Sequence, residues 1–412
     1  MVSACSYSRP CWLQWTACTP DGRRRSTRPD EIATRVLNTE PASSEGFSSL
    51  SIPTHRGSTI VYPDYESFAA RGKHQRHEYT YGLAGTPTTR TLQNRLTELE
   101  SAHDTFLTPS GLSAITTVFL AVCSPGDRVL IPDNVYPPVR RFADGVLARL
   151  GIVAVYYDPR IAAAPIEAPE RLRLVWIEAP GSTTIEIPDF GRLHTLARTQ
   201  GALIGYDNSW ATPLLHRPLE QGADIVVEAL TKYLTGHSDL LMGSISVASE
   251  ELACTVHAYI TSLGLGVSPD DCFLALRGME TASVRLAHVG FSALWLAEQL
   301  QSAAPVDEVL HPGLPTFNGH RCWRKRSFGT SGLFTVVLKP EDLGAFRRRF
   351  DSLSIFRLGA SWGGTHSLLA PVFLDRERSL DRSYARKPLL RISSGLEAKE
   401  DLLEDLMGNV FA

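Results

Sequence analysis

Between residues 104 and 230, short apolar runs rich in β-branched residues alternate with segments of helical composition. We predict strands in six runs, at 104–111, 127–133, 152–158, 171–180, 202–209 and 224–230. We predict helices at 111–122, 137–151 and 190–201. Strands separated by helices are typical of βαβ units and of a mainly parallel sheet with helices on both faces. Ligands bind such sheets at the carboxyl ends of the strands, so the residues that follow each strand are of most interest.

Near residue 270 the pattern changes to one that is typical of a smaller α+β domain. A long helical stretch at 271–302 leads into a strand at 332–338 and a second helix at 340–353. The run 354–364, a strand within 388–395 and a helix from about Ala398 complete the chain.

The composition excludes several classes of protein. Of the 412 residues, 43% are hydrophobic and 21% are charged, which is ordinary for a soluble chain with a large core. A net charge of −3 gives no general attraction to nucleic acid or to an anionic membrane. The sequence contains no run of 18 apolar residues, so we predict no transmembrane helix. The seven cysteines form no C-x-x-C pair, which favours a reducing compartment such as the cytoplasm over a disulfide framework or a zinc site.

Residues 1–26 do not show the periodicity of the rest of the chain. They combine three cysteines, two tryptophans and the cluster Arg23–Arg25. We expect a disordered tail here; an organelle transit peptide is the alternative, because the segment is poor in acids and rich in Arg and Ser.

Two strand-end residues, Asp207 and Lys232, are the strongest candidates for chemistry. Each has a simpler explanation, since an acid there can cap a helix and a lysine can be a solvated strand end. Together they provide what pyridoxal phosphate requires, an amine for its aldehyde and an anion for its pyridine nitrogen. By contrast, His74 and His77 have no third ligand at metal spacing, so we predict no metal site.

Five motifs in a fixed order resemble the Cys/Met-metabolism family of pyridoxal-phosphate enzymes: "YDNSWATP" at 206–213, "TKYLTGHSDLLMG" at 231–243, "SGLFTVVL" at 331–338, "SWGG" at 361–364 and "LRISSGLE" at 390–397. The resemblance runs from about Thr27 to the end of the chain. Within the family it is strongest to the cystathionine β-lyases, because "EAPGST" at 178–183 and Trp362 differ from the usual residues of the γ-acting members.

The resemblance implies the aspartate-aminotransferase-like fold type I, with a mainly parallel seven-stranded sheet. It implies an arm at 27–80 that contacts a neighbouring subunit, a cofactor-binding domain at 81–270 and an α+β domain at 271–412. It also implies a homo-oligomer, a tetramer of two active dimers, that acts on a small amino acid.

The resemblance also assigns roles within the site. Lys232 would carry pyridoxal phosphate covalently and move protons, while Asp207 would pair with the pyridine nitrogen and Tyr136 would stack on the ring. Arg391 would bind the substrate α-carboxylate, as a guanidinium fork does well. The phosphate would be held by Gly111, Leu112, Thr231 and the neighbouring subunit's Tyr81, and the carboxylate pocket would be lined by Ser361 and Trp362.

The implied reaction is β-elimination from cystathionine or a related S-substituted cysteine. One stretch, "HEYTYGLAGTPTTRT" at 77–91, departs from the family. Many members have an arginine where Leu83 stands, and some β-lyases have a second at Ala84; Arg90 could compensate. The departure leaves open a specialised enzyme that catalyses β- or γ-elimination or substitution on another activated amino acid. A non-catalytic relative is the third alternative.

Overall fold

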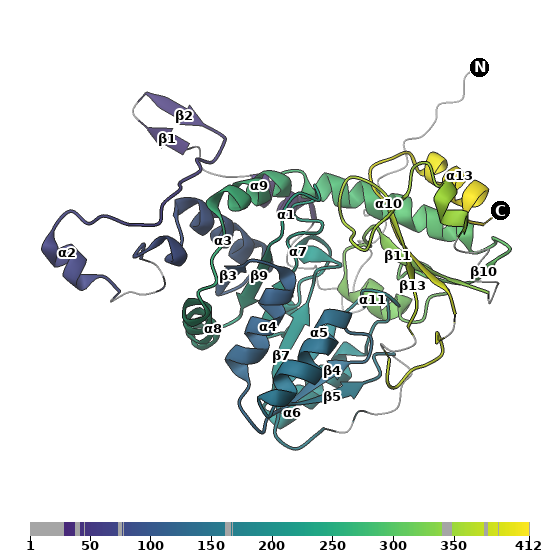
Figure 1. The fold of residues 1–412 in the computed structure, drawn as a ribbon, viewed down its shortest axis with the longest axis horizontal. Helices are drawn as coiled ribbons and strands as arrows, with labels where there is room; N and C mark the ends of the chain where they lie inside the picture. The colour runs from purple at the N-terminus through teal and green to yellow at the C-terminus, as the bar shows by residue number, and fades with distance from the viewer. Residues whose placement is uncertain are drawn as a thin grey trace.

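Two β-sheets organise the chain in a computed structural model (Figure 1). The structure describes residues 29–37, 42–44, 46–72, 76, 78–160, 166, 168–339, 348–374, 378–385 and 387–411. The predicted tail at 1–26 therefore lies outside the described residues. So do His74 and His77, and most of the helix predicted at 340–353.

The larger sheet has seven strands and is mainly parallel, as the sequence and the family resemblance predict. Its order is β3-β9-β8-β7-β6-β4-β5, and only β9 runs antiparallel to its neighbours. The strands are β3 (Asp104–Thr108), β4 (Arg128–Pro132), β5 (Val153–Tyr157), β6 (Leu172–Glu178), β7 (Leu203–Asp207), β8 (Ile225–Glu228) and β9 (Gly243–Val247).

Successive side chains of these strands enter two different cores, because side chains alternate between the faces of a strand. In β8, Val226 joins one core while Ile225 and Val227 join the other. One face is covered by α4 (Gly111–Val122), α5 (Pro137–Phe142) and α8 (Glu250–Leu263). The opposite face is covered by α3 (Pro87–Glu100), α6 (Phe190–Gln200), α9 (Pro269–Met279) and α10 (Ala282–Leu300).

Helix boundaries follow local signals that the sequence contains. Helix α4 begins after Ser110, whose hydroxyl accepts a hydrogen bond from the Ser113 N–H at 3.1 Å, as an N-cap does. Helix α6 ends at Gly201, which adopts the left-handed conformation with φ of 64°.

Two expectations about elements were incomplete. The helical stretch predicted at 271–302 is two helices, α9 and α10, because the chain turns at Glu280 and Thr281, just after Gly278. Strand β9 is among the elements that were not predicted from the sequence. This short strand carries Ser244 and Ser246, and so lacks a continuous apolar run.

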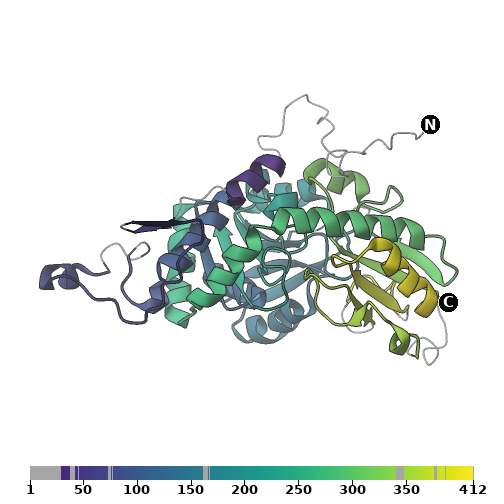
Figure 2. The same cartoon turned by 90° about the horizontal axis from the view of Figure 1, so that it is seen from above.

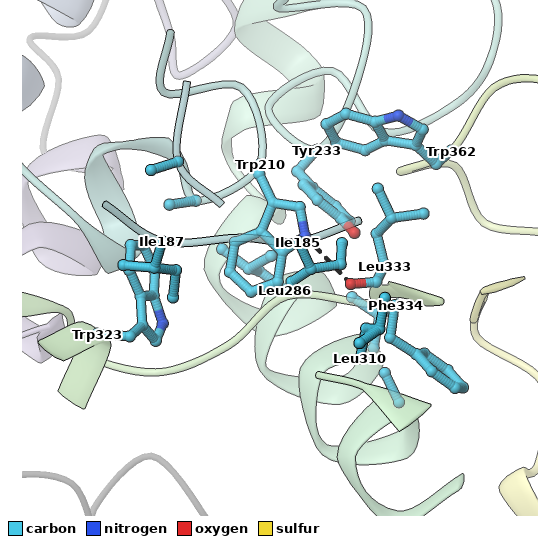
Figure 3. Packing of buried hydrophobic residues seen from close by; sticks show 14 of the residues in the cluster. Ile185, Ile187, Trp210, Tyr233, Leu286, Leu310, Trp323, Leu333, Phe334 and Trp362 are labelled. Atoms are coloured by element: carbon cyan, nitrogen blue, oxygen red, sulfur yellow. Dashed lines mark hydrogen bonds between the residues drawn. The ribbon is translucent and has the colours of Figure 1, made fainter. Parts of the chain in front are cut away.

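The smaller sheet has the order β10-β11-β14-β13-β12. Its strands are β10 (Val306–Leu310), β11 (Leu333–Leu338), β12 (Arg357–Leu358), β13 (Leu368–Val372) and β14 (Leu389–Ser393), accompanied by α11 (His320–Arg326) and α13 (Lys399–Asn409). Apolar side chains join it to the larger sheet, and the Trp210 indole N–H donates to the Leu333 carbonyl at 3.1 Å (Figure 3).

The N-terminal region projects from the body in both views (Figures 1 and 2). Helix α1 (Pro29–Leu37) packs on the body through Ile32 and Val36. The projecting part contains the hairpin of β1 (Ala42–Ser44) and β2 (Phe47–Ser49), followed by α2 (Tyr65–Ala70). The chain returns to the body through the short helix η2 (Gly82–Ala84) and enters α3.

Candidate active site

Residues at the carboxyl ends of the parallel strands surround a cavity of about 190 Å³. Glu178 ends β6, Asp207 ends β7, and Lys232 lies shortly beyond β8. The residues predicted for the site line this cavity, with two exceptions, Ser361 and Tyr81; those that line it are Lys232, Asp207, Tyr136, Gly111, Leu112, Thr231, Trp362 and Arg391. The structure thus brings residues from both sheets to one place, at the edge where an α/β sheet binds ligands.

Lys232 extends toward the C-terminal sheet. Its ammonium nitrogen donates to the Ser361 hydroxyl at 2.8 Å and lies 5.0 Å from the centre of the Trp362 ring. Burial and the positive charge of Arg391 lower the pKa of Lys232 to about 8, although Asp207 opposes the shift. The amine is therefore neutral far more readily than that of an exposed lysine, as a nucleophilic amine must be.

Two carboxyl groups lie side by side where β6 meets β7, since Glu178 and Asp207 are register partners. Burial raises the pKa of both, and the charge of Asp207 helps to raise the pKa of Glu178 to about 8. Glu178 accepts hydrogen bonds from the backbone N–H groups of Tyr136 (2.8 Å) and Ser182 (3.0 Å). A cation beside Asp207 would favour its ionised form.

The N-terminus of α4 borders the same cavity. The first N–H groups of a helix have no partner within the helix, so those at Gly111 and Leu112 are available to an anion. A Cβ atom at Gly111 would lie 2.6 Å from the Ala229 Cβ, which shows how tightly this turn packs on the chain after β8. The Thr231 hydroxyl bonds to the Met242 backbone, with its oxygen 3.0 Å from the nitrogen and 3.2 Å from the carbonyl.

Arg391 reaches the cavity from β14. Its guanidinium donates to the carbonyls of Ala360 and of Ser182, the latter at 3.5 Å. Arg391 and Lys232 are the cationic side chains among the residues that line the cavity, and a guanidinium stays charged at any physiological pH.

Comparison with known proteins identifies the family. Residues 33–410 match the family described as "Cys/Met metabolism PLP-dependent enzyme". A protein of Rhizobium johnstonii named "Putative cystathionine beta-lyase" is 39% identical over 91% of this chain and 94% of its own. A Wolbachia pipientis protein named "L-alanine/L-glutamate racemase" is 36% identical, over 87% and 91%. The chain also resembles the crystal structure of cystathionine gamma synthase from Xanthomonas oryzae pv. oryzae, with a TM-score of 0.84 and 29% identity over 92% and 97%.

The chain belongs to the Cys/Met-metabolism family of PLP-dependent enzymes. The predictions of an enzyme, of fold type I and of pyridoxal phosphate as cofactor are confirmed. The cavity fits the cofactor chemically. It offers an amine for the aldehyde, a carboxylate for the ring nitrogen, and a helix N-terminus for the phosphate.

Residues 81–84, which belong to the stretch that departs from the family, lie apart from the cavity of Lys232 in the same subunit. Tyr81 is 56% exposed and borders a second hollow of about 320 Å³, together with Leu83 and Ala84. Leu83 approaches Gly266, where a Cβ atom would come within 2.9 Å of it. Arg90 donates to the Arg76 carbonyl at 2.8 Å and does not line the cavity of Lys232. One subunit therefore does not bring Tyr81 to its own cavity, and the predicted role in a neighbouring subunit stays a prediction.

Four polar residues of the cavity were not predicted from the sequence: Ser110, Glu178, Ser182 and Ser209. Glu178 ends an apolar strand just as Asp207 does, so the same signal was present. Ser209 accepts a hydrogen bond from the Ala229 N–H at 2.7 Å and donates its own N–H to Asp207 at 2.9 Å. It thereby ties the chain after β7 to the chain after β8.

Two kinds of feature are absent from the described part of the chain. No group of three or more His, Cys, Asp or Glu side chains there is arranged to hold a metal ion. Within the same residues, no helix combines the length and the apolar character needed to cross a membrane.

Proposed function

We propose that this enzyme is a carbon–sulfur lyase. It eliminates the β-substituent of cystathionine or of a related S-substituted cysteine, giving a thiol, pyruvate and ammonia. The proposal rests on one observation above the others: the partly buried amine of Lys232 shares a cavity with the carboxyl of Asp207 and the guanidinium of Arg391. Relatives of the chain named cystathionine beta-lyase support the choice of reaction.

Each residue has a task in this reaction. Arg391 binds the substrate α-carboxylate through two N–H groups, with Ser361 and Trp362 beside it. The neutral amine of Lys232 takes the α-proton and is the nearest acid to return one. Pyridoxal phosphate, when bound, withdraws electrons from the α-carbon and makes its proton acidic. Asp207 would pair as a carboxylate with the ring nitrogen of the bound cofactor, and Tyr136 would lie against its ring.

The elimination balances without any further reactant except water. The Cα–H bond breaks with its proton passing to Lys232, and its electron pair becomes the new Cα=Cβ bond. The Cβ–S bond breaks with its electron pair leaving on sulfur as thiolate. The unsaturated amine that is released takes up water and gives pyruvate and ammonia.

We also propose that the enzyme works as a homo-oligomer, a tetramer of two active dimers, in the cytoplasm. Residues 27–80 would form the arm, 81–270 the cofactor domain and 271–412 the C-terminal domain. The projecting arm supports this assembly, because it carries apolar side chains that one subunit leaves exposed, namely Phe47, Leu50, Val61, Tyr65 and Phe68. Such surface is typical of a protein–protein contact.

A second candidate is a specialised enzyme that acts on another activated amino acid. The stretch at 77–91 favours it, because Leu83 and Ala84 offer no cation to a distal carboxylate such as that of cystathionine. A substrate with a neutral β-substituent would not need one.

The test is turnover by the purified holoenzyme. Cystathionine, neutral cysteine S-conjugates, O-activated homoserines and L-alanine are each supplied, and pyruvate, 2-oxobutyrate, substituted products and loss of the α-proton are measured. We expect pyruvate and thiol in equal amounts. Loss of the α-proton without pyruvate would indicate racemisation, and 2-oxobutyrate or a substituted product would favour the second candidate.

Replacing Lys232 by Ala should abolish both pyruvate formation and the absorbance of bound pyridoxal phosphate, because no other amine of the cavity can replace it. Lys387→Ala is the matched control, since Lys387 pairs with Asp307 at 2.7 Å in the C-terminal sheet region. Turnover that survives Lys232→Ala would contradict the assignment.

A further inference from the structure

The link between β13 and β14 docks onto the larger sheet. Its residues 378–385 carry Arg378 and Ser379, which meet Asp133, the residue directly after β4. The Asp133 side chain has no exposed surface. It accepts hydrogen bonds from the Arg378 Nε (3.0 Å), the Ser379 N–H (2.8 Å) and hydroxyl (2.6 Å), and the N–H groups of Leu380 (3.1 Å) and Asp381 (3.2 Å).

This carboxylate is held in its ionised form. Burial alone would raise the pKa of Asp133, but the hydrogen bonds from Ser379, Asp381 and Leu380 outweigh burial and hold the pKa below its ordinary value. Arg140 adds a second cation, whose Nη2 lies 2.7 Å from Asp133. A buried carboxylate with so many donors is satisfied only while the link stays docked.

One guanidinium joins two loops of the larger domain. Arg378 is 6% exposed, and its Nη1 donates to the Thr184 hydroxyl at 2.9 Å and to Glu186 at 2.8 Å, while its Nε bonds Asp133. The two loops are also joined directly, because the Asn134 side-chain amide donates to Glu186 at 2.8 Å.

Both loops lead into the active-site cavity. Tyr136 lies three residues after Asp133, and Ser182 lies two residues before Thr184; both line the cavity. Glu178, which lines the cavity, accepts hydrogen bonds from the backbone N–H groups of Tyr136 and Ser182. Arg378, which does not line it, donates to Asp133 and Thr184 of the same two loops. The link itself continues into β14, which holds Arg391.

We propose that Arg378 is a positioning residue: by latching the link 378–385 to the loops at Asp133 and Thr184–Glu186, it fixes Tyr136 relative to Arg391. The consequences for turnover rest on the proposed function. Misplacing a catalytic contact by about an ångström can cost up to a hundredfold in rate, so loss of the latch is expected to matter although Arg378 does not line the cavity.

The test compares two Arg→Lys variants as holoenzymes. Arg378→Lys keeps the charge, but one ammonium cannot bond Asp133, Thr184 and Glu186 in the geometry of a planar fork. Arg160→Lys is the matched control. Arg160 is at the margin of the same cluster, with its Nη1 3.4 Å from Asp381 and its side chain 41% exposed, and it bonds neither Asp133 nor Glu186.

For Arg378→Lys we expect kcat/KM for pyruvate formation to fall about tenfold to a hundredfold, with unchanged cofactor content. The loss should shrink to less than about threefold in a Tyr136→Ala background, because residues that act through one another are not additive. Arg160→Lys should match the unaltered enzyme. A lower melting temperature with unchanged kcat/KM, or a loss that is undiminished in the Tyr136→Ala background, would overturn the proposal.

A second readout separates this inference from the proposed function. Binding of an amino acid changes the absorbance of bound pyridoxal phosphate whichever reaction follows. The affinity for the amino acid, measured by titration, should be lower in Arg378→Lys than in the unaltered enzyme, even if the unaltered enzyme forms no pyruvate. If Arg378→Lys does not fold, Glu186→Gln replaces it. The same non-additivity with Tyr136→Ala is expected, and full additivity would again refute the latch.

Discussion

At the scale of single residues, the lowered pKa of Lys232 predicts how the rate of cofactor uptake depends on pH. Only the neutral amine attacks the aldehyde of pyridoxal phosphate. Since the pKa of Lys232 is lowered to about 8, the neutral fraction increases as the pH rises through this value. The rate at which the apoenzyme takes up the cofactor, followed by absorbance, should therefore reach half of its plateau near pH 8. With a lysine of ordinary pKa, the rate of cofactor uptake would continue to rise until about pH 10.

Arg391 provides the control for this prediction. Its positive charge is the second cause of the shift, after burial. Arg391→Gln should therefore move the midpoint to higher pH, toward that of an ordinary lysine. A midpoint that stays in place would show that the charge of Arg391 does not act on Lys232.

The same scale shows what the sequence could reveal about the site. Lys232 and Asp207 were found because each follows an apolar strand and each suits one end of a known cofactor. Glu178 satisfies the first condition too, but its importance depends on β6 lying beside β7 so that it pairs with Asp207. Which strands are neighbours depends on the order of strands in the sheet, and an acid at the end of one strand does not reveal that order.

At the scale of elements, the contact between α4 and the chain after β8 can be tested. Adding a methyl group at Gly111 would place it 2.6 Å from the Ala229 Cβ, so the helix N-terminus must move away from Ala229 and change its position at the cavity. Overpacking of this kind costs about 1–3 kcal/mol. If the cost falls on the bound state, Gly111→Ala should weaken binding of pyridoxal phosphate to the apoenzyme by about five- to a hundredfold.

Gly145→Ala is the matched control, because a Cβ atom there meets nothing within 4 Å. Titration of each apoenzyme with the cofactor, followed by absorbance, gives the two affinities. Equal affinities for Gly111→Ala and Gly145→Ala would show that the N-terminus of α4 does not hold the phosphate.

Elements with strong local signals were predictable, and elements defined by their partners were not. Helix α4 has a serine cap and a mostly apolar composition, and the sequence predicts its range directly. Strand β9 owes its existence to pairing with β3 and β8, where the Ser246 and Thr105 hydroxyls lie 2.9 Å apart in the interior. A buried strand with alternating serines has no apolar run to reveal it.

At the scale of the whole molecule, the cavity depends on contacts between distant parts of the chain. Lys232 lies on the chain that follows β8 of the larger sheet. Ser361 lies between β12 and β13 of the smaller sheet, and Arg391 lies in its strand β14. Strand patterns predict each sheet but not how the two are packed together. For Arg391 and Ser361 only the resemblance to the family indicated a place in the site.

The proposed contribution of the neighbouring subunit's Tyr81 leads to a complementation experiment. Within one chain Tyr81 borders a hollow separate from the cavity of Lys232. Lys232→Ala subunits should be inactive, and Tyr81→Ala subunits should be weakened in cofactor binding. If Tyr81 acts across the interface, mixed dimers contain one site with both Lys232 and Tyr81 intact, so mixing the two variants should restore activity.

The mixture is refolded or exchanged together, and its activity is compared with the sum of the separate variants. Sedimentation of the same samples reports whether dimers or tetramers are present. A mixture of Lys232→Ala with Lys232→Ala,Tyr81→Ala subunits is the control that should stay inactive, because none of its sites has the amine. Activity of the first mixture no greater than the sum of its parts, in samples shown to contain mixed oligomers, would place Tyr81 outside the neighbouring site. An active monomer would remove the need for the interface altogether.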